Sequence, residues 1–161
     1  MIVIVIMGVI YTLGVTSFPT KEEEVKHLNL LTLKEYLQAQ EFEKSARFLC
    51  LDDCTSCRVL LDGEGNTTID SFIDDSIRVY RYDYLTGPME VMKEVYFNIE
   101  DVQEDVCFSY TVDTQGIGDQ VLVEYKEEVY DFTPYLTPTK KYASLEEAID
   151  AKTKLIEEVI K

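Results

Sequence analysis

The sequence offers few of the side chains on which catalysis usually depends. Its one histidine, His27, has no neighbouring residues that suggest a triad or a metal site. No P-loop, dinucleotide-binding glycine motif, nucleophile elbow or H-E-x-x-H motif is present. We therefore expect a protein that is not an enzyme and has no small-molecule substrate.

Basic residues are also scarce. The 161 residues include 15 Lys and Arg against 31 Asp and Glu, which gives a formal net charge of −16. Such a charge opposes binding to nucleic acid or to an anionic membrane face. Once the opening segment is set aside, the length suits one domain with a real core.

The opening segment lacks charge altogether. Its first eighteen residues carry no charged side chain, and Lys21 is the first that does. A helix of that length is about 27 Å long, just short of the roughly 30 Å hydrocarbon core. The segment has no preceding basic region and a poor cleavage site, which favours a retained anchor over a cleaved signal. A buried central strand is the third alternative.

The four cysteines, Cys50, Cys54, Cys57 and Cys107, suggest two disulfides in an oxidising compartment, with three possible connectivities. A zinc site using all four and a redox-active C-x-x-C at Cys54 and Cys57 are the alternatives.

The sequence after the apolar segment has no basic excess, so the bulk of the chain is expected to be exported.

Residues 21–49 are predicted to form one long amphipathic helix. Apolar side chains from Val25 to Leu49 recur mostly at steps of three and four residues, and no Gly or Pro interrupts them. Pro19 marks a kink or boundary before this stretch. Together with residues 1–20, the chain up to Leu49 would form a single rod.

Residues 50–143 have the pattern of short antiparallel strands separated by turns. The strongest predicted hairpin alternates at Val106, Phe108, Tyr110 and Val112, and again at Val121, Val123 and Tyr125. Residues 144–161 then predict a C-terminal helix, with Ser144 and Glu147 as a capping box. One helix face is apolar except at Lys152, and it would pack on the sheet or bind a partner.

Two acidic clusters are weak candidates for calcium. Asp70, Asp74 and Asp75 form one, and Asp113 and Asp119 flank the turn with Gly116 and Gly118, but neither fits an EF-hand loop. We therefore predict no cofactor. Tyr80, Tyr82 and Tyr84 share one predicted strand face, where a core role and an aromatic subunit contact both fit.

The run Ile2-Val3-Ile4-Val5-Ile6-Met7-Gly8-Val9-Ile10 resembles the I-V-I-x-I-x-G-I-L stretch of type IV pilins and type II secretion pseudopilins. Pro19 lies near that family's helix-kinking proline. The likeness is close over about the first twenty residues and loose through Leu49. The family's basic leader and its Glu would precede this run and are not in the sequence, which implies a clipped start or different processing.

The resemblance implies an α+β, pilin-like fold. Its long N-terminal helix, with a membrane half (1–20) and an amphipathic half (21–49), would pack on a small antiparallel β-sheet (50–143), followed by a C-terminal helix (144–161). It also implies processing by a prepilin peptidase and N-methylation, which we assign to no residue.

The implied function is that of a structural subunit of a type IV pilus or type II secretion pseudopilus. The chain would sit in the inner membrane as a single-pass protein, with its C-terminal domain periplasmic or extracellular, and assemble with other pilin-like subunits. Gly8 and Gly14 would permit close approach between helices, and the residues expected to contact lipid and then the fibre core are Ile2, Val3, Ile4, Val5, Ile6, Val9, Ile10, Leu13 and Val15.

Two other functions are compatible with the residues. One is a membrane-anchored or secreted binding module stapled by disulfides. The other is a periplasmic thiol oxidoreductase that uses Cys54 and Cys57.

Overall fold

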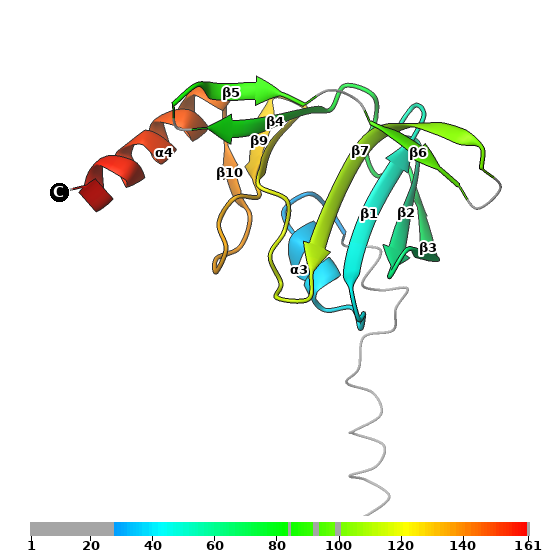
Figure 1. Cartoon of the computed structure of the whole chain (residues 1–161). Helices are drawn as coiled ribbons and strands as arrows, with labels where there is room; N and C mark the ends of the chain where they lie inside the picture. Colours follow the sequence, from blue (N-terminus) through cyan, green and yellow to red (C-terminus); the bar gives the residue numbers. More distant parts are fainter. Residues whose placement is uncertain (1–27, 84, 92–93, 99–100, 161) are drawn as a thin grey trace, which may run out of the picture.

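The computed structural model describes residues 28–83, 85–91, 94–98 and 101–160. Within these residues the chain forms two five-stranded antiparallel sheets and two helices (Figure 1). The first sheet has the order β3-β2-β1-β7-β6 and consists of β1 (Ser45–Leu51), β2 (Ser56–Leu61), β3 (Glu64–Asp70), β6 (Val95–Phe97) and β7 (Gln103–Asp113).

The second sheet has the order β10-β9-β8-β4-β5. Its strands are β4 (Arg78–Asp83), β5 (Gly87–Glu90), β8 (Val121–Tyr125), β9 (Glu128–Asp131) and β10 (Lys140–Tyr142). The short helix α3 (Leu33–Gln38) packs on the first sheet, and α4 (Leu145–Ile160) lies against β9 and β10 of the second. Figure 1 shows β7 on the side of the first sheet that faces the second.

A tight turn at Asp62 and Gly63 joins β2 to β3. Both residues have positive φ, 56° and 91°, as a type I′ hairpin turn requires, and Asp-Gly is a favoured sequence for it. The Asp62 carboxylate accepts hydrogen bonds from the N–H groups of Glu43, Lys44 and Ser45 at 2.9, 2.6 and 3.1 Å. The same carboxylate therefore ties this turn to the start of β1.

The main core lies between the two sheets. The first sheet contributes alternate residues of β1, β2 and β7, the second contributes β8 and the segment after β9, and Leu33 and Leu37 of α3 close one end. Its largest fully buried side chains include Phe48, Phe108, Tyr110, Val123 and Phe132.

Helix α4 covers the opposite face of the second sheet. Leu122, Val129 and Ala148 form a small buried cluster there, with Tyr80 and Tyr82 packed against it. The helix begins with the expected capping interaction: the Glu147 N–H donates to Ser144 Oγ at 3.2 Å, and the Ala143 N–H donates to Glu147 Oε2 at 2.7 Å.

The pilin-like α+β fold predicted from the sequence is wrong. In the described part of residues 21–49, the only α-helix is the six-residue α3, and strand β1 begins at Ser45. Strand β1 is buried on both faces, since Phe48 points into the main core while Leu49 and Leu51 pack in a second cluster. That double burial produced an apolar spacing that resembled a helix. The predicted small sheet is instead a pair of sheets.

In the part of the chain that the structure describes, no helix is both long enough and apolar enough to cross a bilayer. This finding contradicts the single-pass inner-membrane location that the sequence predicted. Residues 1–20, where the span was predicted, lie outside the described residues, and so do Pro19 and His27.

Candidate functional site

A cleft of about 580 Å³ opens between the two sheets, along the outer edge of β7. The first sheet lines it with Arg47 of β1 and with residues of β7 that include Ser109 and Thr111. The second sheet contributes apolar residues, among them Val79 and Val121. This volume falls in the range of sites that hold small molecules or short peptide segments.

Strand alternation decides which side chains of β4 face the cleft. Val79 and Arg81 lie opposite Val123 and Val121 of β8, and these valines belong to the main core. Arg78 and Tyr80 therefore project from the other face of β4, where the Tyr80 hydroxyl donates to Glu124 Oε2 at 2.9 Å. Arg81 faces the cleft directly, while Arg78 lies at its rim.

Arg47 is held in place by its neighbours. Its Nε donates to Ser109 Oγ at 2.9 Å, and its terminal nitrogen lies 3.6 Å from Glu94 Oε2. The Arg47 side chain is 29% exposed, against 63% for Glu94. The pair with Glu94 is thus open to solvent and weak, whereas the bond to Ser109 fixes the guanidinium against β7.

The other two arginines differ in their partners. The Arg81 side chain makes no hydrogen bond or ion pair with any residue that the structure describes, so its guanidinium is available to a ligand. At the rim, a hydrogen bond with Tyr80, together with the nearby carboxylates of Glu90 and Glu124, raises the pKa of Arg78. Both groups carry a positive charge at physiological pH.

Arginine is concentrated at this cleft. The chain has eleven lysines and only four arginines, yet Arg47, Arg78 and Arg81 line the cleft, and none of the lysines that the structure describes does. Arg58, the fourth, lies exposed on β2. Because a guanidinium can bind a carboxylate or phosphate through two parallel N–H groups, this choice of residue favours recognition of one of these anions.

Three carboxylates also line the cleft: Glu90, Glu94 and Asp119. Asp119 is already used within the protein, because its Oδ2 accepts the Thr111 N–H at 2.7 Å. The three arginines and three acids that line the cleft among the described residues give a formal charge near zero, in a chain of −16. The cleft is therefore much less negative than the rest of the molecule.

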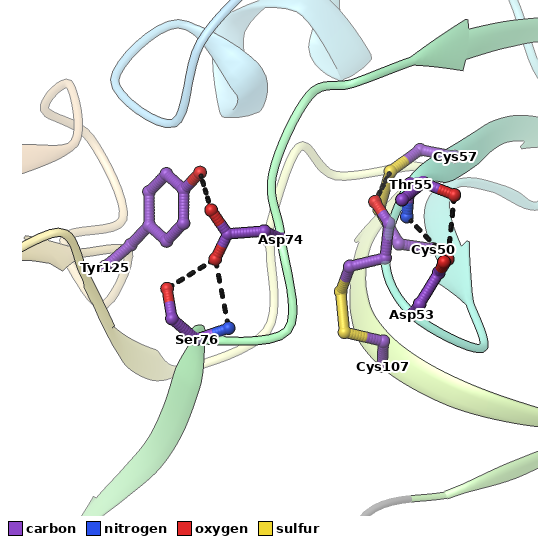
Figure 2. Close-up of a disulfide and its surroundings, with 9 residues drawn as sticks. Cys50, Asp53, Thr55, Cys57, Asp74, Ser76, Cys107 and Tyr125 are labelled. Carbon is purple, nitrogen blue, oxygen red and sulfur yellow. Dashed lines mark hydrogen bonds between the residues drawn. A yellow bond between two sulfur atoms is a disulfide. The ribbon is translucent and has the colours of Figure 1, made fainter.

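The prediction of two disulfides is confirmed. Cys50 bonds to Cys57 within the β1–β2 hairpin, and Cys54 bonds to Cys107 of β7 (Figure 2). Cys54 and Cys57 thus bond to different partners, so the C-x-x-C pair on which the oxidoreductase alternative depends is not formed. All four sulfurs are held in these bonds, so none is a free thiolate for zinc.

The acidic clusters considered for calcium serve other roles. Asp74 accepts hydrogen bonds from Ser76 and from the Tyr125 hydroxyl, the latter at 3.1 Å (Figure 2). The Asp113 carboxylate accepts the N–H groups of Gln115 and Ile117, both at 2.9 Å. Across the described ranges, no three acidic, cysteine or histidine residues form a group that could hold a metal ion.

The predicted tyrosine face is a packing surface. Tyr80 and Tyr82 lie against α4, and the Lys152 ammonium is 5.7 Å from the centre of the Tyr82 ring. Tyr84 lies outside the described residues.

The sequence alone did not point to the arginines. Arg78 and Arg81 were interpreted only as parts of a β-strand, and Arg47 was assigned to a helix. The rarity of arginine relative to lysine was visible in the sequence. That the arginines line one cleft was not visible in the sequence, because it depends on how strands β1 and β4 of different sheets pack. The predicted fibre-core residues between Ile2 and Val15 all lie outside the described residues.

No protein-family model, curated protein or solved structure matches the chain.

Proposed function

We propose that this chain is a binding domain, stapled by two disulfides for an oxidising compartment, whose cleft holds a ligand through a carboxylate group. The observation that carries this proposal is the gathering of Arg47, Arg78 and Arg81 at one cleft of an acidic chain. Structural disulfides persist mainly in secreted proteins and oxidising compartments, which supports the compartment.

Arg47 and Arg81 suit different tasks. Arg47 is fixed by its bond to Ser109, so a ligand meets a charged group that is already ordered. Arg81 has no ion pair among the described residues and can close on a carboxylate without losing an internal partner. The apolar walls at Val79, Val91 and Val121 give the remainder of the ligand a surface to cover.

The pilin-like subunit stays a prediction, but we do not adopt it. Its closest sequence support lies in residues outside the described part of the chain. Within the described part, α3 and β1 take the place of the predicted rod through Leu49. The binding module is the alternative that needs neither the rod nor a membrane span.

The test is calorimetric titration of the full chain with two carboxylate probes, succinate and a short peptide with one glutamate, and with inorganic phosphate. We expect saturable binding of at least one carboxylate probe, and about tenfold weaker binding by Arg81→Ala. Arg58→Ala is the matched control, because it removes an exposed arginine outside the cleft and should bind as the wild type does. The proposal fails if neither carboxylate probe binds, or if Arg81→Ala binds as tightly as the wild type.

A further inference from the structure

Among the residues that the structure describes, the outer edge of β7 has a stretch in the middle that no strand pairs with, and we call it the open stretch. On its inner side, β7 pairs with β1 from Val106 to Asp113. On its outer side, β6 pairs only with Gln103 to Asp105, and a single bridge joins Val112 to Gly118. Between these two points, no described strand pairs with the outer edge.

The backbone groups at the two ends of this stretch are already bonded. The Thr111 N–H donates to Asp119 Oδ2, and the Thr111 carbonyl accepts the Asp119 N–H at 3.0 Å. At the other end, the Val106 N–H donates to the carbonyl of Glu94 at 2.9 Å. The open stretch is therefore short and has a defined start and end.

Ser109 lies at the centre of the open stretch. In an antiparallel pair, successive residues direct their N–H and C=O groups alternately toward and away from the partner strand. Thr111 directs both groups outward, to Asp119, so Ser109, two residues earlier, also directs its N–H and C=O outward. This edge lines the cleft, and the Ser109 hydroxyl on the same residue holds Arg47.

We propose that the ligand of this cleft is an extended peptide segment with one acidic side chain, which adds as a short strand to β7 at Ser109. The Ser109 N–H and C=O pair with the peptide backbone, while Arg47 and Arg81 bind the carboxylate. Strand addition gives affinity through the backbone and selectivity through alternate side chains. This inference rests on the proposed function and specifies its ligand.

A single acidic side chain fits better than a polyacidic one. The chain carries −16, and Glu90 and Glu94 flank the cleft, so each further negative charge on a ligand adds repulsion. β-Branched residues beside the glutamate suit both an extended backbone and the valine side chains of the second sheet.

The first experiment changes the peptide and leaves the protein unchanged, so the comparison cannot perturb the fold of the protein. Fluorescence polarisation of the full chain compares an end-blocked peptide of threonines and valines around one glutamate with three relatives. The first replaces glutamate by glutamine, the second is methylated on backbone nitrogens, and the third replaces the valines by glycine. We expect the glutamine and N-methylated peptides each to bind at least about tenfold more weakly.

Succinate separates this inference from the proposed function. If succinate binds in an Arg81-dependent manner while N-methylation leaves peptide affinity unchanged, strand addition is refuted and carboxylate binding stands. If no carboxylate probe binds, both fail.

A protein variant tests the edge directly. Ser109→Pro removes the outward N–H but none of the N–H groups that bond to β1, and proline is tolerated at strand edges. We expect it to abolish peptide binding, whereas Ser109→Ala keeps the backbone group and should bind with a smaller loss. Unchanged peptide affinity in a folded Ser109→Pro would overturn the inference. If that variant does not fold, the N-methylated peptide decides.

Discussion

The disulfide between Cys54 and Cys107 joins the β1–β2 turn to β7 across 53 residues of sequence. Cys107 stands at an irregularity in the β1–β7 ladder, where Cys50 pairs with Phe108 but Leu51 pairs with Val106. Cys107 also lines the cleft. The bond thus fixes the point at which β7 changes its pairing, directly beside the open edge.

The two disulfides should differ in their contribution to stability. A cross-link that closes a longer loop removes more entropy from the unfolded chain, and Cys50 and Cys57 are only 7 residues apart. We expect Cys54→Ala with Cys107→Ala to lower the free energy of unfolding by about 4 kcal/mol, and Cys50→Ala with Cys57→Ala by about 2 kcal/mol. Urea unfolding of the two double variants measures both. The reverse order would contradict the loop argument.

Lys152 of α4 makes a shielded ion pair with Asp131 of β9. Its Nζ lies 2.9 Å from Asp131 Oδ2, and the side chains are 11% and 4% exposed. The same aspartate accepts the Thr133 N–H at 2.9 Å. Lys152→Met leaves the Asp131 charge buried without its cation, so we expect a loss of about 3 kcal/mol or more in the free energy of unfolding.

The control for this prediction is the pair between Lys141 and Glu128. Its atoms are equally close, at 2.8 Å, but the side chains are 45% and 40% exposed. Lys141→Met should therefore cost less than about 1 kcal/mol. Equal losses in Lys141→Met and Lys152→Met would show that burial of the Asp131 pair does not matter.

Local signals were accurate where one element decides the structure. Ser144 and Glu147 cap a helix as their spacing predicted, and the alternation from Val106 to Val112 forms β7. Lys152 interrupted the apolar face of the predicted helix without explanation. The structure supplies the reason, because Asp131 on a strand 21 residues earlier needs a buried cation.

The prediction was wrong where two distant elements decide the structure. Strand β1 is buried on one face by the second sheet and on the other by Leu60 and Val106. Its alternation was therefore masked, and the helical spacing of apolar residues prevailed in the interpretation. The cleft could not be predicted for the same reason, since Arg47 and Arg81 line one cleft only when the two sheets pack.

Asp62 should make stability depend on acid pH. The N–H groups of Glu43, Lys44 and Ser45 lower the pKa of its carboxyl below the usual 3.8. The unfolded chain therefore takes up this proton first, so the stabilisation is complete above about pH 4 and is lost as pH falls through the folded pKa. Asp62→Asn keeps a residue that tolerates φ of 56° but removes the charge.

The measurement for Asp62 is urea unfolding at several pH values between about 2 and 6. We expect Asp62→Asn to be less stable than the wild type at neutral pH and to show a shallower loss toward low pH. Parallel curves for the two proteins would contradict this role, and NMR titration of the Asp62 carboxyl gives its pKa directly.

Tyr110 carries a hydroxyl that the fold does not use. The side chain is fully buried against Phe132, with ring centres 4.5 Å apart, and its oxygen has no hydrogen-bond partner among the described residues. Burial raises the pKa of this phenol, so it stays neutral and pays for desolvation without compensation. We expect Tyr110→Phe to raise the free energy of unfolding by about 1 kcal/mol.

The matched control is Tyr125→Phe, which removes a hydroxyl that donates to Asp74 at 3.1 Å and should lower stability by a similar amount. Urea unfolding of both variants decides, and a loss of stability in Tyr110→Phe would mean that its hydroxyl has a partner after all.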